Sequence, residues 1–302
     1  MIIYCNQCTT SNEIRFLLGV VFFYPYSFIS NKKIKIDHKT TLPSKPTTLK
    51  IKYVISPKIA SMFSLFKSKP RLSDLIPNTY VDIHSHVLPG IDDGAKSLEE
   101  TKSLTSEMKQ LGFSKIITTP HTMTNIWDNT PETITKALIE VNATLTLPFT
   151  IEAASEYALD ESVIQKANNK TLLTLKENYV LVELSYLNAP LQLYDFLYEL
   201  QLAGYQIVLA HPERYAYYHN NKKEYIKLKK AGCYFQLNLL ATVGYYGKEV
   251  ADTAHHLIKE NLYDFTGSDI HHKNHIKAFQ DKITHNNGEK IANLMLNNTL
   301  FK

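Results

Sequence analysis

Side chains that bind divalent metals recur at the ends of short apolar runs in this 302-residue sequence. The first run, 80–86, ends in His84 and His86, whose i, i+2 spacing puts both imidazoles on the same side of a strand. Neutral imidazoles with carboxylates suit zinc, manganese, iron or related ions, whereas the lack of thiolates argues against a structural zinc site. Because one ion takes about four to six ligands, nine protein ligands predict two or three ions that share bridging carboxylates. The nine candidates are His84, His86, Asp93, His121, Glu156, Glu183, His211, Asp269 and His271.

Each of these pieces alone also has a plainer interpretation. A single His at a strand end is more often a hydrogen-bonded surface residue than a ligand, Glu183 could pair with a lysine, and Asp92-Asp93-Gly could be only a turn. The prediction of a metal site rests on convergence, because six strand ends all supply ligand types. His272 stays open, since it follows a proposed ligand. The other histidines of this region are interpreted as surface residues of loops or helices: His219, His255, His256, His275 and His285.

Arg214 is one of only three arginines, and it alone follows a proposed ligand strand. Its planar guanidinium fork suits an oxyanion such as phosphate. The alternative is a structural arginine that caps a helix or pairs with a carboxylate.

The elements that must position these residues alternate regularly. Near-continuous apolar strands are typical of a buried parallel sheet, and seven strand–helix units predict an α/β fold. In a (β/α) barrel the C-terminal ends of the strands converge on one face, where sites are built. The predicted strands are 80–86, 115–120, 149–155, 179–184, 205–210, 233–238 and 262–266. The predicted helices are 98–111, 131–145, 191–203, 222–231, 248–260 and 276–297, the last with a break near Gly288.

Residues 1–70 differ from this pattern and carry 11 Lys and Arg against 2 Asp and Glu. Their apolar run, 16–28, is shorter than the roughly 20 residues that span a bilayer, and it makes a poorly formed signal peptide. Cys5 and Cys8 lack a second pair or a histidine partner, so no zinc or redox site is expected there. We predict a linker-like N-terminal extension. The abrupt onset of pattern after Met62 further gives the hypothesis that Met62 is the native start, which the intact mass of the protein from its own host tests.

Residues 71–302 are acidic, with 22 Lys and Arg against 27 Asp and Glu. They give no electrostatic reason to expect nucleic-acid binding, and an exonuclease groove would need clustered basic residues. With three cysteines the chain has no disulfide framework, which favours a reducing, cytoplasmic compartment. No stable membrane insertion is expected, and the oligomeric state is not predicted.

Several motifs resemble those of the polymerase-and-histidinol-phosphatase (PHP) superfamily. They are Asp82-Ile-His-Ser-His86, Pro89-Gly-Ile-Asp-Asp-Gly94, Thr119-Pro-His121, His211-Pro-Glu-Arg214 and Ser268-Asp-Ile-His271. Within the PHP superfamily, the chain is similar to the bacterial manganese-dependent tyrosine-protein phosphatases of capsule and exopolysaccharide operons. The likeness covers about residues 80–279, and residues 1–61 have no counterpart in the family pattern.

The resemblance implies a distorted (β/α)7 TIM-like barrel, the PHP fold, over residues 71–302. It implies two or three metal ions, normally Mn²⁺ with Fe, Zn or Mg as alternatives, held by the nine candidates. The resemblance implies that Asp93 is a metal ligand, that Asp92 is only its neighbour, and that Arg214 binds the phosphate. The sequence shows no second arginine after His271, so Lys273 or Lys277 would have to supply a further phosphate contact.

These features predict a phosphomonoester hydrolase with Arg214, Asp93 and His271 in catalytic roles. The best candidate is a tyrosine-protein phosphatase acting on a tyrosine kinase of polysaccharide export with a Tyr-rich tail. The alternatives are a phosphatase of a small metabolite, such as histidinol phosphate, and a non-catalytic metal-binding regulatory module. His271 and His86 are both candidates for the general acid. A cysteine-phosphatase mechanism is excluded, since Cys233 opens a buried strand without a phosphate loop.

Overall fold

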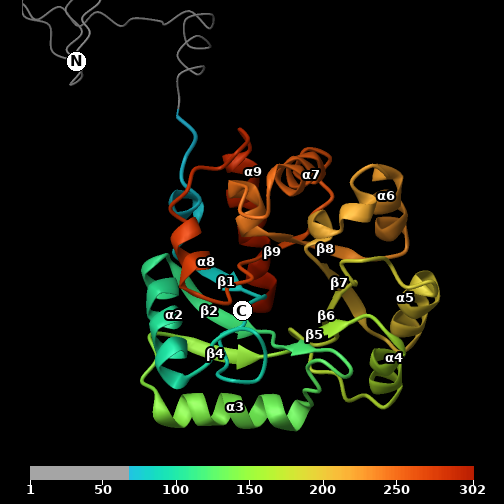
Figure 1. The fold of residues 1–302 in the computed structure, drawn as a ribbon, viewed down its shortest axis with the longest axis horizontal. Coiled ribbons are helices and arrows are strands. Elements are labelled where there is room, and N and C mark those ends of the chain that lie inside the picture. Colours follow the sequence, from blue (N-terminus) through green and yellow to red (C-terminus); the bar gives the residue numbers. More distant parts are fainter. Residues whose placement is uncertain (1–67) are drawn as a thin grey trace, which may run out of the picture. The chain divides into compact units, whose positions relative to one another are not determined.

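A computed structural model describes residues 68–302, and every pairing between their named strands is parallel (Figure 1). Three strands form a sheet in the order β1-β2-β4, and six form a second sheet in the order β3-β5-β6-β7-β8-β9. The strands are β1 (Tyr80–Asp82), β2 (Phe113–Thr118), β3 (His121–Thr122), β4 (Thr150–Ala153), β5 (Glu156–Ala158), β6 (Tyr179–Glu183), β7 (Gln206–Ala210), β8 (Tyr234–Asn238) and β9 (Phe265–Gly267).

Helices lie on the outer side of these curved sheets (Figure 1). The α-helices are α2 (Leu98–Gln110), α3 (Pro131–Thr144), α4 (Glu161–Asn168), α5 (Leu193–Leu202), α6 (Lys222–Lys230), α7 (Lys248–Lys259), α8 (Lys273–Ala278) and α9 (Gly288–Asn297). Short 3-10 helices complete the chain: η1 (Ser73–Leu75), η2 (Pro212–Arg214), η3 (Ala216–Tyr218), η4 (Leu239–Val243) and η5 (Asn298–Phe301). The predicted α/β architecture with parallel strands is therefore confirmed.

Backbone hydrogen bonds link the edges of the two sheets at two places. Ala154 N, between β4 and β5, donates to Thr118 O at 2.9 Å. The strand predicted over 115–120 is therefore followed, after a short interruption, by β3, and the strand predicted over 149–155 is likewise interrupted before β5. At the other side, Asp269 N donates to His84 O at 2.7 Å and His86 N donates to Ile270 O at 2.9 Å. The chain segments after β1 and after β9 thus run side by side, and both carry candidate ligands.

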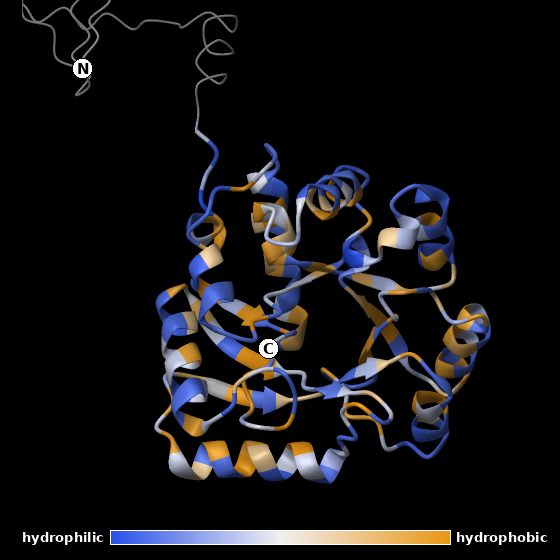
Figure 2. Ribbon diagram, viewed as in Figure 1, coloured by the Kyte–Doolittle hydropathy of each residue, from blue (hydrophilic) through white to orange (hydrophobic). Residues whose placement is uncertain are grey.

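Both faces of the sheets are buried, which explains the continuous apolar strands. In β6, Val180 and Val182 pack in one core cluster while Leu181 packs in another. Helix α3 buries Ile134, Ala137 and Val141 on one side, and apolar and polar residues alternate along it (Figure 2). Side-chain N-caps start α2, α3 and α4; at α4, Asp160 accepts hydrogen bonds from Ser162 N and Val163 N at 2.8 and 3.2 Å.

The predicted helices differ from the structure at two places. The sequence pattern gave no helix between the third and fourth strands, but α4 lies there with Asp160 as its N-cap. The helical segment predicted over 276–297, with a break near Gly288, is two helices: α8 begins earlier, at Lys273, and an irregular segment over 279–287, longer than the predicted break, separates it from α9. Leu72 N donates to Asp281 O and Ile283 N to Pro70 O at 3.0 and 3.1 Å, so that segment pairs with the chain before η1 instead of continuing the helix.

The predictions for Cys5, Cys8, the apolar run 16–28 and Met62 lie outside the described residues. Within residues 68–302, no helix combines the length and apolar character needed to cross a bilayer.

Candidate metal centre

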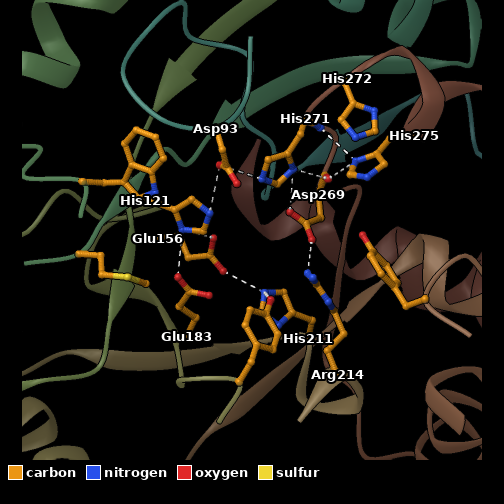
Figure 3. A pocket seen from close by; sticks show the side chains of 14 residues that line it. Asp93, His121, Glu156, Glu183, His211, Arg214, Asp269, His271, His272 and His275 are labelled. Carbon is orange, nitrogen blue, oxygen red and sulfur yellow. Dashed lines mark hydrogen bonds and ion pairs between the residues drawn. The ribbon is translucent and has the colours of Figure 1, made fainter. Parts of the chain in front are cut away.

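The structure brings all nine candidate ligands to one pocket of about 370 Å³ or to its buried floor. Seven of them come from the C-terminal end of a strand or from the loop that follows it, and two begin short strands that lie just beyond β2 and β4. His84 and His86 follow β1, Asp93 lies in the next loop, and His121 and Glu156 begin β3 and β5. Glu183 ends β6, His211 follows β7, and Asp269 and His271 follow β9 (Figure 3).

Four overlapping groups of these residues have ligand atoms that lie within 4.8 Å of one another. Neighbouring groups share His84, His86, His121 or Glu156, so the nine side chains form one connected set. The groups are His86, Asp93, His121 and His271; His84, His211 and Asp269; His84, His86 and Glu156; and His121, Glu156 and Glu183.

Glu156 lies at the middle of this set (Figure 3). Its Oε1 is 3.0 Å from His211 Nε2, and its Oε2 is 3.1 Å from His84 Nε2 and 3.2 Å from His121 Nδ1. Burial alone would raise the pKa of Glu156, but attraction from His84 and His121 lowers it well below its ordinary value. A permanently charged carboxylate between three imidazoles is suited to bridge two cations.

The far nitrogen of several imidazoles is occupied by an oxygen atom. His84 Nδ1 is 2.9 Å from Gln236 Oε1, His86 Nδ1 is 2.7 Å from Asp92 Oδ2, and His271 Nδ1 is 2.9 Å from the carbonyl oxygen of Asp269. With Nδ1–H donating in each case, Nε2 of all three rings keeps its lone pair for a metal.

Two polar residues of β8 support the centre, and the sequence analysis did not single them out. Gln236 holds His84, as above, and Asn238 Nδ2 donates to Asp269 Oδ2 at 2.7 Å. Arg214 Nη1 donates to the same oxygen at 2.8 Å, while Asp269 Oδ1 lies 3.3 Å from His84 Nε2. The two Asp269 oxygens therefore have different roles, and only Oδ1 faces the imidazoles. An i, i+2 pair of amide side chains in an otherwise apolar strand was the available sequence signal.

Backbone conformation at the strand ends aims two of these residues. His211 and Asp269 have φ angles of 33° and 51°, a left-handed region that non-glycine residues rarely adopt. Such conformations persist where the surrounding structure imposes them, often at functional sites. Gly94 meets a different demand, because a Cβ there would lie 2.0 Å from the carbonyl oxygen of His86. The loop that carries Asp93 can pack against His86 only with glycine at this position.

The donor set fits divalent metal ions. His121 Nδ1 and Glu183 Oε1 are buried and 3.0 Å apart, yet neither makes a hydrogen bond, as expected of two ligands of one ion. His86 Nε2 is likewise buried without a hydrogen bond. Burial would lower the pKa of His84, but attraction from Glu156 and Asp269 raises it to about 9. The carboxylates thus favour positive charge at this position, which a bound cation can supply in place of protons.

Arg214 lines the pocket between two aromatic rings. Its guanidinium carbon lies 4.8 Å from the ring centre of Tyr186 and 4.2 Å from that of Tyr246. Stacking on both faces fixes the plane of the fork, while the Nη1 bond to Asp269 fixes its direction. Arg214 therefore has both properties that the sequence left open: it pairs with a carboxylate and it faces the pocket.

One expectation for the other histidines is wrong. His275 was expected on the surface, but it is only 7% exposed, lines the pocket, and accepts a hydrogen bond at Nδ1 from His271 N at 3.2 Å. His272 lines the pocket too, whereas Lys273 and Lys277 are not among its lining residues in the described part of the chain. His275 Nδ1 also lies 3.0 Å from the carbonyl oxygen of Asp269, so His275 on α8 is held against two candidate ligands.

Comparison with known proteins places this architecture in a family. The family model for capsular polysaccharide synthesis, CpsB/CapC, matches residues 80–299, which is nearly the whole described region. The chain belongs to the CpsB/CapC family. The family resemblance found in the sequence is thereby confirmed.

Individual members of the CpsB/CapC family support the same placement. The chain is 30% identical over 195 residues to tyrosine-protein phosphatase YwqE of Bacillus subtilis, covering 63% of this chain and 77% of YwqE. It is 29% identical over 202 residues to tyrosine-protein phosphatase CpsB of Streptococcus pneumoniae, covering 63% and 82%. A solved structure from work on YwqE and CpsB, described there as unique metal-dependent tyrosine phosphatases, superposes with a TM-score of 0.62 at 28% identity and covers 66% and 84% of the two chains.

Proposed function

We propose that this CpsB/CapC protein is a metal-dependent tyrosine-protein phosphatase. The observation that carries the proposal is the convergence of nine ligand-type side chains and Arg214 on one pocket. We assign the metal-ligand roles to the nine residues named above, with manganese as the ion and two or three ions per chain. Imidazole and carboxylate ligands without thiolate support this choice.

The bound metals would lower the pKa of water toward neutrality and offset negative charge on a phosphoryl group. The chain's own residues supply the rest. The guanidinium of Arg214, held between Tyr186 and Tyr246, offers N–H donors to phosphoryl oxygens as charge develops on them. Because Asp269 takes Nη1, the remaining donors of the fork are the ones available to substrate.

The pocket walls favour an aryl phosphate. Met123, Trp127, Tyr186 and Tyr246 line it beside the polar residues, and they supply apolar and aromatic surface for a phenyl ring. A tyrosyl oxygen, whose phenol has a pKa of about 10, leaves with less protonation than an alkyl alcohol. His271 lines the pocket and His86 is fully buried, but both rings donate Nδ1–H to an oxygen and offer Nε2 to a metal, so neither candidate general acid keeps a proton for the leaving oxygen.

We also propose the finer features of the fold and its setting. Residues 71–302 form the metallophosphatase domain as a (β/α)7 barrel of the PHP type, supported by the hydrogen bonds that join the end of β2 to Ala154, between β4 and β5, and the segment after β9 to that after β1. The low cysteine content supports a cytoplasmic location. The substrate is a phosphotyrosyl protein, and a bacterial tyrosine kinase of capsule synthesis with a Tyr-rich tail is the candidate.

Phosphate release tests the proposal. The full chain, with added manganese, is compared on a phosphotyrosyl peptide and on histidinol phosphate. We expect faster release from the peptide, and loss of release with chelator or with His211→Ala. Preference for histidinol phosphate would overturn the assignment to protein substrates, and metal binding without turnover of either would favour the regulatory module.

A further inference from the structure

Large apolar side chains are exposed along one segment next to the pocket. Of twelve large hydrophobic residues exposed in the described part of the chain, six lie within residues 186–202. Tyr186, which is 45% exposed, belongs to the pocket wall. The other five form what we name the outer strip: Leu187, Leu191, Tyr194, Tyr198 and Leu202, with exposures of 87%, 98%, 39%, 64% and 74%.

The side chains of the outer strip lie outside the buried core, although Tyr194 Oη donates a hydrogen bond to Glu224 on α6. Helix α5 packs on the sheet with a different face, since Leu193, Leu197 and Leu200 are at most 4% exposed. Tyr194, Tyr198 and Leu202 follow one another at i, i+4 and i+8, so they share a second, outward face. Contiguous exposed apolar surface of this kind marks interaction sites on soluble proteins.

The outer strip begins beside the pocket, because Leu187 directly follows the pocket residue Tyr186 in the chain. Glu183 ends β6 within the ligand set, and three residues later the ring of Tyr186 stacks on His211, with ring centres 5.9 Å apart and planes 19° apart. Leu187 follows directly. Hydrogen bonds hold this loop in place: Leu184 N donates to Tyr215 Oη at 2.9 Å, and Tyr217 Oη donates to Ser185 O at 3.0 Å.

We propose that the outer strip docks the polypeptide that flanks the phosphotyrosine of the substrate. This inference rests on the proposed function. From Tyr194 to Leu202 the helix rises about 12 Å, the length of roughly four residues of extended chain, which is more than a phosphotyrosine alone needs. Asp195 and Glu199 are exposed on the same helix. The segment that fits is therefore rich in apolar side chains and poor in acidic ones.

Kinetics on matched substrates test the docking role. The full chain is compared with the double variant Leu191→Ser, Tyr198→Ser on three substrates: a phosphotyrosyl peptide flanked by leucines, one flanked by serines, and free phosphotyrosine. Wild type should prefer the leucine-flanked peptide about tenfold in kcat/KM, through KM. The double variant should lose this preference and hydrolyse free phosphotyrosine at the wild-type rate.

Ile139→Ser on α3 is the matched control, because Ile139 lies outside the outer strip and its exposed fraction of 62% is similar to the 64% of Tyr198. It should keep the wild-type preference. Equal kcat/KM of wild type on the two peptides would overturn the docking role while the phosphatase assignment stands. If wild type hydrolysed none of the three substrates, the proposed function itself would fail. Sedimentation of both proteins gives a further test. If wild type formed an oligomer and the double variant were a monomer, the docking role would be contradicted and the strip would bind a second copy of this chain.

Discussion

A buried carboxyl group beside the metal centre gives a prediction for stability. Glu213 is fully buried, accepts hydrogen bonds from Asn238 N and Tyr263 Oη at 2.8 Å each, and has no lysine or arginine paired with it in the described residues. Burial raises its pKa from 4.5 to about 7. The native state therefore holds this proton more tightly than the unfolded chain does.

The sign and size of the effect follow from proton linkage. Below about pH 4.5 the carboxyl is protonated in both states and contributes no pH dependence. As pH rises toward 7 the unfolded state loses the proton first, so the native state loses stability relative to it. A pKa difference of about 2.5 is worth about 3 kcal/mol at about 1.4 kcal/mol per pKa unit.

Glu213→Gln removes this titration and keeps a similar shape. We expect the free energy of unfolding of wild type, minus that of the variant, to fall by about 3 kcal/mol between pH 4.5 and 7.5. Urea unfolding at a series of pH values, with chelator present in every sample to remove metal linkage, measures this difference. A difference that stays constant, or rises with pH, would refute the assignment of a raised pKa to Glu213.

Three further predictions concern the centre and the core. Gln236→Leu removes the acceptor for His84 Nδ1, so manganese affinity measured by calorimetry should fall about 10–100-fold, and unchanged affinity would contradict the supporting role. Arg214→Lys replaces the fork by a point charge, so kcat/KM for a phosphotyrosyl peptide should fall about tenfold or more, with equal kcat/KM as the contrary result. Burial raises the pKa of Cys233 to about 12, so iodoacetamide at pH 8 should leave it unmodified until urea is added, as peptide masses will show; rapid labelling of the folded protein would contradict this.

The convergence of the candidate ligands could be predicted where a metal-binding residue type coincides with the end of a strand. His84, His86 and Glu183 could be recognised because a polar metal-binding type ends an apolar run, and the parallel topology brings such ends together. Arg214 could be recognised by its rarity. These signals are local in the chain, and the fold class follows from the same periodicity.

Features that depend on long-range contacts could not be predicted in the same way. Gln236 supports a residue 152 positions away, and nothing next to it in the chain indicates that His84 is its partner. His275 enters the pocket because the chain after Asp269 turns inward, a conformation that has no composition signal. The sequence indicates a break near Gly288, but the length of the irregular segment over 279–287 depends on its pairing with residues 70–72, far back in the chain. By contrast, α4 has a local signal in the sequence, because Asp160 is a residue type that caps helix N-termini.

The central claim is that the nine side chains hold the metal ions of a phosphatase. Anomalous diffraction at the manganese edge, from a crystal of the full chain grown with manganese, tests it most directly. We predict two or three peaks, each within about 2.0–2.5 Å of ligand atoms from the nine residues, with Glu156 next to more than one. A crystal with manganese in solution and no anomalous peak among these side chains would contradict the account.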